Sequence, residues 1–266
     1  MQKYIYRWCV IIHRALKMKT LAYKHLKLLD ESNEKKCEAC FWYSIKWGIN
    51  RLNDWESKLP SRVEDQILSK FEGFRKKGEL PPELRIPELK GFRLVDSERH
   101  RKWKSHLSGE PTYDNIQANP DDVLTDGNNF IIVDIKTIAK NPENCTCENM
   151  QKDIDDYNYK LQSAIYNYVF RGAKINTLDH SYILFYYIKG IDKEGNLIVG
   201  NERFKIAVDT NVVKPLLKRV KEIIKLENPP PVRCKFCSSM KQRLDDLNKG
   251  NPDLKSLLNL MLKRDS

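Results

Sequence analysis

The amino-acid sequence predicts an α/β protein, with strands in the middle of the chain and helices toward both ends. Several central segments are rich in β-branched and aromatic residues and bounded by Gly, Asn or Asp, which is typical of strands. Nearer the ends, apolar residues recur every three or four positions, as on a helix that covers a core. The same order of elements also fits the α+β class.

The predicted strands are residues 92–95, 113–124, 130–136, 182–189 and 197–208. The predicted helices are residues 4–56 with a break at 30–36, then 62–76, 154–170 and 211–226, followed by two short helices after residue 237.

Residues 126–129, Asp-Gly-Asn-Asn, are expected to form the turn of a hairpin between two of these strands, because they tolerate positive φ. These patterns divide the chain into three parts. Residues 1–90 form a basic helical N-terminal region, residues 91–210 a core with strands, and residues 211–266 a basic helical C-terminal region.

The net charge of +11 is concentrated at the ends of the chain. Residues 1–36 carry nine bases and three acids, and residues 213–266 carry thirteen bases and six acids, so the remaining residues sum to −2. Basic ends suit a polyanionic partner, although lysines on solvated helix faces give the same pattern. Bases alternate with aromatic residues in 42–51 and 92–104, which is typical either of nucleic-acid contacts or of ordinary core positions.

No membrane or export signal is predicted. The apolar run at residues 8–12 is far shorter than the roughly 20 residues of a membrane span, and no small-residue cleavage site follows it. We therefore expect a cytoplasmic protein with no membrane partner. Its seven cysteines are then reduced thiols or metal ligands.

The most informative segment is the strand that contains Asp134 and Lys136. Two positions apart on a strand, their side chains lie on the same face. The hairpin turn brings Asp121 or Asp122 toward Asp134, and paired carboxylates of this kind suit Mg²⁺ or Mn²⁺. Beside such a metal, Lys136 would orient or help to deprotonate a water and stabilise charge on a phosphate. The alternative is a surface hairpin with an exposed ion pair.

Three motifs follow one another in the order of a known superfamily: Asp121 before the hairpin, Val-Asp-Ile-Lys-Thr at 133–137, and Gln162 with Tyr166 one helical turn apart. Together they resemble the PD-(D/E)XK nucleases, in their RecB-like branch. The resemblance implies a restriction-endonuclease-like fold, a central mixed sheet flanked by helices.

The resemblance also implies roles for single residues. Asp121, Asp134 and Lys136 would be catalytic, and the metal would be held by Asp121, Asp134 and the backbone carbonyl of Ile135. Gln162 and Tyr166 would contact the active centre or DNA.

An upstream acid on helix 62–76, Glu64 or Asp65, would complete the site, and Asp65 is our choice. The chain departs from the family at Ala118, where the pattern has Gly, and at Pro120. Because proline donates no ladder hydrogen bond, it implies an edge or bulged strand there. Either Asp122 replaces Asp121, or the site is altered.

Two C-x-x-C pairs flank this core, Cys37 with Cys40 and Cys234 with Cys237. Two such pairs supply the four ligands of a tetrahedral site. Some RecB-like nucleases, including the CRISPR spacer-acquisition exonucleases, close their core around a [4Fe–4S] cluster, which the resemblance implies here. Those proteins use one early cysteine and three late ones, so Zn²⁺ is the alternative, and redox-active or buried thiols are a third interpretation.

The predicted function is therefore a Mg²⁺- or Mn²⁺-dependent deoxyribonuclease, an exonuclease in preference to an endonuclease, acting on DNA that is single-stranded or has free ends. A helicase or integrase-type protein partner fits the resemblance. The alternative is a nucleic-acid-binding module on the same fold with an altered catalytic site. A metal-stabilised scaffold for a protein or RNA partner is the third hypothesis.

Overall fold

The computed structural model describes residues 20–33, 36–48, 58–105, 109–138, 142–194, 197–239 and 242. The chain divides into two compact units. The sheet unit contains the described residues from 20–27 and 58–218, and the cysteine unit contains those from 28–48 and 219–242. The helix predicted at 4–56 is described only in part, and the last predicted helices lie outside the described residues.

The sheet unit is built on a five-stranded mixed sheet with the order β1-β4-β5-β6-β7. These strands are β1 (Arg93–Leu94), β4 (Asp122–Thr125), β5 (Phe130–Ile138), β6 (His180–Ile191) and β7 (Leu197–Ala207). Neighbours pair antiparallel except β5 and β6, which are parallel. A parallel pair requires a crossover, and the chain between β5 and β6 supplies it as helices. The predicted class, a mixed sheet flanked by helices, is confirmed.

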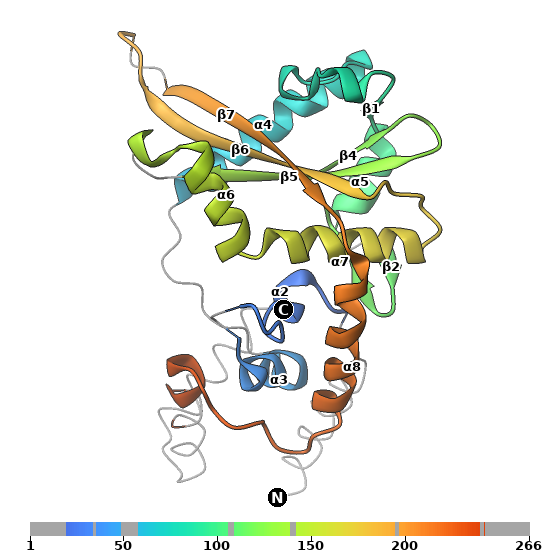
Figure 1. Ribbon diagram of the computed structural model, residues 1–266, viewed down its shortest axis with the longest axis vertical. Helices are drawn as coiled ribbons and strands as arrows, with labels where there is room; N and C mark the ends of the chain where they lie inside the picture. The colour runs from blue at the N-terminus through green and yellow to red at the C-terminus, as the bar shows by residue number, and fades with distance from the viewer. Residues whose placement is uncertain are drawn as a thin grey trace, which may run out of the picture. The chain divides into compact units, whose positions relative to one another are not determined.

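Helices cover both faces of the sheet. Figure 1 shows α4 on one side and α6 and α7 on the other. The helices of the sheet unit are α2 (Tyr23–Leu26), α4 (Lys58–Lys77), α5 (Ser97–Lys104), α6 (Cys147–Asp156) and α7 (Tyr159–Gly172), and α8 (Val213–Ile224) begins in it. A small hairpin of β2 (Thr112–Tyr113) and β3 (Ile116–Gln117) forms a second sheet, and α3 (Glu38–Trp47) belongs to the cysteine unit.

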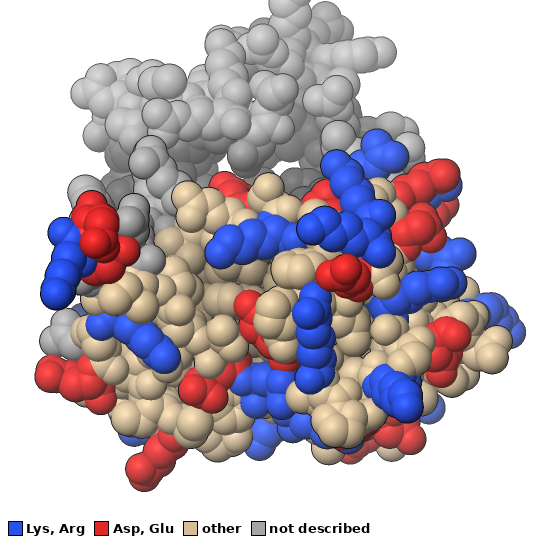
Figure 2. Space-filling model, turned by 90° about the horizontal axis from the view of Figure 1, so that it is seen from above, with Lys and Arg blue, Asp and Glu red and all other residues tan. Residues whose placement is uncertain are grey.

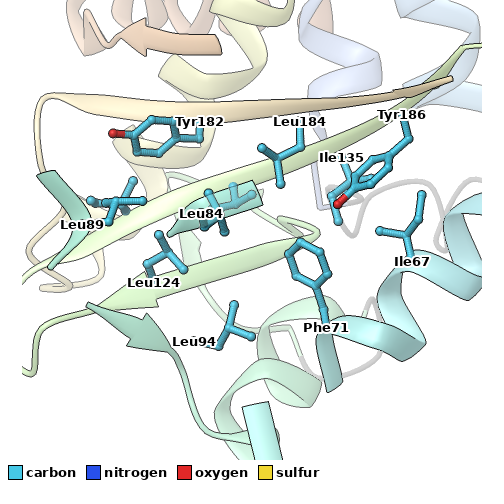
Figure 3. Close-up of a cluster of buried hydrophobic side chains, with 12 residues drawn as sticks. Ile67, Phe71, Leu84, Leu89, Leu94, Leu124, Ile135, Tyr182, Leu184 and Tyr186 are labelled. Atoms are coloured by element: carbon cyan, nitrogen blue, oxygen red, sulfur yellow. The ribbon is translucent and has the colours of Figure 1, made fainter. Parts of the chain in front are cut away.

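The core has one layer on each face of the sheet, because side chains along β5 and β6 alternate in direction. Val133 and Ile135 of β5 lie with Phe71 of α4 in one cluster, which Figure 3 shows beneath the strands. Ile183 and Phe185 of β6 lie in the other cluster, against α6. Each fully buried apolar side chain contributes about 1.5 to 3 kcal/mol. The even-numbered residues of β5 therefore face α7, and these include Asp134 and Lys136.

The crossover differs from the single helix predicted at 154–170. It consists of α6 and α7, separated by a break at Tyr157 and Asn158. Asn158 has φ of 58°, a left-handed conformation that asparagine tolerates, and its side chain accepts a hydrogen bond from the N–H of Leu161 at 3.3 Å. The break is thus a helix cap that turns the chain between two helices.

The strand predicted at 113–124 is also divided. Asp114 and Asn115 adopt positive φ and form the turn between β2 and β3, while β4 begins only at Asp122. Pro120 lies before β4, so it removes no ladder hydrogen bond, and neither an edge position nor a bulge is needed to accommodate it. Helix 62–76 and the turn at 126–129 occur as predicted, with Gly78 at φ of 68° ending the helix.

The surface carries charges of both signs. Figure 2 shows Lys and Arg interspersed with Asp and Glu over the face that it views. No helix in the described segments is long and apolar enough to cross a bilayer.

Candidate active site and cysteine cluster

Asp134 and Lys136 lie side by side on the face of β5 that is directed toward α7. Lys136 Nζ is 2.5 Å from Asp134 Oδ2, and the two side chains are 20% and 5% exposed. The pair is therefore too buried for the exposed surface hairpin that the sequence left open. A carboxylate and an ammonium held together in the interior need further polar partners to be tolerated.

Asp121 is the first such partner. The register of β4 and β5 pairs Asp122 with Val133, which places Asp121 opposite Asp134 at the start of the strand. Asp121 Oδ2 accepts a hydrogen bond from the N–H of Ile135 at 2.9 Å. Two carboxylates and an ammonium thus converge on one short stretch of β5.

Asp122 points to the opposite face, as neighbouring residues on a strand do. Its carboxylate is fully buried and accepts a hydrogen bond of 2.6 Å from Arg75 Nη2, on α4. Arg75 also donates to the carbonyl of Val95. The alternative in which Asp122 replaces Asp121 is therefore wrong in position, because Asp122 belongs to a buried ion pair on the α4 side.

The charges of the site shift one another's protonation. Burial raises the pKa of Asp134, the charge of Lys136 lowers it and that of Asp121 raises it again, with a net upward shift. Burial lowers the pKa of Lys136, but Asp134 and Asp121 raise it by more, so its net shift is upward too. Lys136 is therefore a stable cation between two acids, one of which is reluctant to ionise fully.

Helix α5 holds Asp121 in place. His100 Nε2 is 2.8 Å from the backbone carbonyl of Asp121, and Asn119 Nδ2 donates to the carbonyl of Trp103 at 3.1 Å. One turn after His100, Lys104 Nζ lies 3.8 Å from Asp121 Oδ1. That nitrogen is buried and has no hydrogen-bond acceptor among the described residues. A second ammonium, from α5, therefore lies close to Asp121.

Gln162 and Tyr166 meet each other on α7. Both side chains are buried, and Gln162 Nε2 lies 3.0 Å from the hydroxyl oxygen of Tyr166. Burial raises the pKa of Tyr166, and the charges of Asp134 and Asp121 contribute in the same direction. The two side chains therefore share one face of α7, and Tyr166 interacts electrostatically with both acids, while contact of the pair with DNA or metal stays a prediction.

Two tyrosines that the motifs do not include also face the site. The ring of Tyr159 lies 4.8 Å from Lys136 Nζ, a cation–π distance. Burial raises the pKa of Tyr159 to about 12 and that of Tyr23 higher still, and Asp134 raises both. Both phenols therefore remain protonated at neutral pH, and the hydroxyl of Tyr23 donates to the backbone carbonyls of Tyr157 and Asn158.

Glu64, not Asp65, is the acid of α4 that interacts with this site. Burial raises the pKa of Glu64, Asp121 raises it further, and Lys104 and Lys136 lower it. Asp65 is exposed. Consecutive helical residues are about 100° apart on the helix, so only one of the two acids faces the sheet. Of the two acids that the sequence offers, Glu64 is therefore the one placed toward the site, while Asp65 remains a prediction that its exposed position does not favour.

Three aromatic residues of the two basic segments, Trp42, Tyr43 and Trp103, belong to the core. Trp42 and Tyr43 are buried in α3, and Trp103 of α5 packs edge-on against Phe130 and Phe170. In the described residues they are not available to stack on bases, which leaves their core interpretation. Residues 49–51 lie outside the described part of the chain.

The four cysteines of the two C-x-x-C pairs come together in the cysteine unit. All four Sγ atoms lie within 4.8 Å of one another. Cys37 and Cys40 flank the first turn of α3, and the N–H of Cys237 donates to Cys234 Sγ at 3.4 Å. Hydrogen bonds from Cys237 and Cys40 lower the pKa of Cys37, which favours the thiolate that binds metal. The group is able to hold a metal ion.

Contacts inside the cysteine unit brace the helix that carries the first pair. Arg219 donates two hydrogen bonds to Glu38, from Nε at 2.6 Å and from Nη2 at 2.7 Å. Trp42 Nε1 donates to the carbonyl of Leu226 at 3.1 Å. The C-terminal part of the described chain is thus tied to α3 beside the cysteines.

Sequence reasoning named Glu64 only as the alternative to Asp65, and it missed His100, Lys104, Tyr23 and Tyr159 as members of the acid site. Tyr159 carried a signal, because it shares a helix face with Gln162 and Tyr166 at a spacing of three and seven residues. Tyr23 carried none. It reaches the site only because its hydroxyl donates to the carbonyls of Tyr157 and Asn158, more than a hundred residues away.

No family model and no curated protein match this chain. Among solved structures it is similar to a phage-related exonuclease from Haemophilus somnus 129PT, at a TM-score of 0.48 and 11% identity over 79% of this chain and 94% of that one. It is also similar to an alkaline exonuclease, LHK-Exo, from Laribacter hongkongensis, at a TM-score of 0.44 and 12% identity over 88% of this chain and 97% of the other. For that enzyme in complex with dAMP the TM-score is 0.36, at 11% identity over 79% and 88% of the two chains. These likenesses are distant, so the function proposed below rests on the geometry of the site.

Proposed function

We propose that this protein is a divalent-metal-dependent nuclease that hydrolyses phosphodiester bonds in DNA. The observation that supports it is the arrangement of Asp121, Asp134 and Lys136, with 2.5 Å between the ammonium nitrogen and the carboxylate of the two β5 residues. Burying two acids and a lysine together costs folding free energy. A cluster of this kind is therefore a candidate for a catalytic site.

The donor set suits a hard cation. Asp121, Asp134 and the carbonyl of Ile135 would offer oxygen ligands to Mg²⁺ or Mn²⁺, and Glu64 would be a further acid nearby. Burial is the main cause of the raised pKa of Asp134, and repulsion from Asp121 adds to it; a cation between the two carboxylates would relieve that repulsion. When bound, the metal supplies Lewis acidity at the scissile phosphate.

The chain's own residues then divide the remaining work. Because its pKa is raised, Lys136 stays protonated, orients water and stabilises the charge that develops on phosphate oxygens rather than accepting a proton. Tyr159, whose pKa is raised, supplies a neutral hydroxyl beside it, while Tyr23 holds the backbone of Tyr157 and Asn158 in place. Gln162 and Tyr166 line the site from α7.

A cleavage assay with Lys136→Ala tests this function. We expect Mg²⁺- or Mn²⁺-dependent degradation of linear DNA by the wild type and a rate about 10²- to 10³-fold lower in the variant, typical for loss of one electrostatic stabiliser. Lys205→Ala is the matched control, because Lys205, on β7, forms an exposed ion pair with Glu88. Equal rates for wild type and Lys136→Ala would refute the role of this lysine.

The same assay decides between the subordinate predictions. Linear DNA degraded while covalently closed circles survive supports an exonuclease that needs free ends. Salt-sensitive DNA binding without metal-dependent turnover supports the alternative of a binding module with an altered site. The helicase or integrase-type partner stays a prediction.

For the four cysteines we propose a single tetrahedrally coordinated ion, the Zn²⁺ alternative to a [4Fe–4S] cluster. All four Sγ atoms lie within 4.8 Å of one another, which supports one shared ion, because Zn–S bonds of about 2.3 Å place tetrahedral ligands about 4 Å apart. Ligands on four separate irons stand farther apart. Anaerobic purification with metal analysis tests this proposal: a colourless protein with one zinc supports it, and a brown protein containing iron overturns it.

A further inference from the structure

Tyr157 is an exposed aromatic side chain next to the proposed active site. It is 54% exposed, the highest value among the large hydrophobic residues that the structure describes. It caps α6, and its ring is stacked on that of Tyr159, with 5.8 Å between centroids and 26° between planes. A single exposed aromatic ring is common on protein surfaces, so the feature that matters here is its position beside Tyr159 and Lys136.

The backbone around Tyr157 is firmly held. Tyr23 Oη donates to the carbonyls of Tyr157 at 3.0 Å and Asn158 at 3.2 Å. Asn158 caps α7 from its left-handed conformation, as described above. The ring therefore projects from a fixed helix junction, so little conformational entropy remains to be lost when something binds to it.

The stack leads directly to the charged residues. Tyr157 lies on Tyr159, Tyr159 lies 4.8 Å from Lys136 Nζ, and Lys136 is 2.5 Å from Asp134. An aromatic surface beside a cation is the arrangement that single-stranded nucleic acids favour, with the base on the ring and the phosphate on the cation. Tyr159 is held between these partners, so Tyr157 is the ring whose surface is open.

We propose that Tyr157 is a stacking site for an unpaired nucleobase of the strand whose phosphate lies at Asp121, Asp134 and Lys136. This inference rests on the proposed nuclease function. Within a duplex, each base face is already covered by its neighbours, so only an unpaired or frayed base can stack on the ring. The structure therefore assigns the substrate class: a single strand, or a duplex end opened at the site.

Binding of a single-stranded oligonucleotide that contains 2-aminopurine tests the proposal, with EDTA present so that nothing is cleaved. Stacking on a tyrosine quenches the fluorescence of this base. We expect quenching by the wild type, about 5- to 100-fold weaker binding with little quenching for Tyr157→Ala, and recovery with Tyr157→Trp. The dependence of affinity on salt should not change in Tyr157→Ala, because stacking releases no counterions.

Tyr113→Ala is the matched control. Tyr113 is 39% exposed and contacts the ring of Tyr168, toward the other end of α7, so it too is an exposed tyrosine beside a second tyrosine, but away from Lys136. Unchanged affinity in Tyr157→Ala overturns the proposal, and so does an equal loss in both variants or an equal loss of binding to a duplex hairpin without free ends. The first result would leave Tyr157 to a protein partner.

Failure of the nuclease function is measured separately. If the wild type stacks the base but does not hydrolyse DNA with Mg²⁺ or Mn²⁺, the stacking site stands and the nuclease does not. If it hydrolyses DNA and Tyr157→Ala neither binds more weakly nor has a higher KM, the nuclease stands and the stacking site does not. If no oligonucleotide binds at all, the stacking site falls.

Discussion

Asp121 and Asp122 are adjacent in the chain, yet their carboxylates lie on opposite faces of the sheet. Asp121 accepts from the Ile135 N–H on the α7 side, and Asp122 accepts from Arg75 on the α4 side. The side chains of Arg75 and Asp122 are 2% and 0% exposed, so losing either partner leaves a buried charge, at a cost of about 3 to 5 kcal/mol. The ion pair of Asp122 thereby helps to fix the register of β4 on β5, and this register places Asp121 at the site.

The upward-shifted pKa of Asp134 predicts how the site responds to pH. A carboxylate whose pKa is raised is still partly protonated at a pH where an ordinary aspartate, with a pKa near 3.9, is fully ionised. Because protons compete with the cation, the Mg²⁺ concentration that gives half-maximal cleavage should rise as the pH is lowered, starting well above pH 5. A cation requirement that is flat down to about pH 5 would contradict it.

The two neighbouring acids of α4 give a matched pair of variants. Glu64 interacts with Asp121, while Asp65 is exposed. We expect Glu64→Gln to lower metal affinity or the cleavage rate about 10- to 100-fold, as is typical for groups that support metal ligands, and Asp65→Asn to change neither by more than about twofold. Titration of the rate against Mn²⁺ measures both. The reverse order of effects would restore the original choice of Asp65.

At the scale of elements, the junction between α6 and α7 sets the direction of the helix that carries Gln162 and Tyr166. Asn158 adopts positive φ there and caps α7. Asn158→Ala should lower the free energy of unfolding by about 2 kcal/mol, because it loses the cap and strains a left-handed residue. Asn158→Gly keeps the conformation and should cost about 1 kcal/mol less. Urea denaturation of the two variants measures the difference, and equal losses would show that the conformation itself costs nothing.

The sequence predicts those elements whose signals are local. The β-branched runs of β5, β6 and β7 and the turn at 126–129 carry their own patterns, and Asp134 and Lys136 share a face by spacing alone. The break at Tyr157 and Asn158 was missed because neither residue is Gly or Pro, and both sides of it continue a helical pattern. The only local sign of such a cap in the sequence is the asparagine itself, a residue that tolerates positive φ.

Residues brought in from distant segments could not be predicted in the same way. His100 and Lys104 lie on a helix whose basic residues all look equally solvated in the sequence, and only the fold directs these two to Asp121. Tyr23 comes from a segment far away in the sequence, and an isolated β-bridge between Leu21 and Ile116 holds that segment against β3. The PD-(D/E)XK pattern is a pattern of local motifs, so it includes none of these three.

At the scale of the whole molecule, the cysteine unit is built from both ends of the described chain. Cys237→Ser should abolish binding of the metal and destabilise this unit, because Cys237 is fully buried among the other three cysteines. Cys147→Ser is the matched control, since Cys147 is an exposed residue at the start of α6. Metal content per chain and the thermal unfolding curve measure both variants. Full metal content in Cys237→Ser would contradict the four-ligand site.

The distance along the chain between the cysteine pairs imposes an order on synthesis. Cys40 and Cys234 are 194 residues apart, and the ribosome adds about 5 to 20 residues per second, so the second pair emerges roughly 10 to 40 s after the first. During that interval the strands of the sheet unit are made, while Cys37 and Cys40 wait as a two-thiol half-site. Binding of the metal by all four cysteines is therefore a late step of biogenesis. A nascent chain that stops before Cys234 would leave the ribosome without the metal.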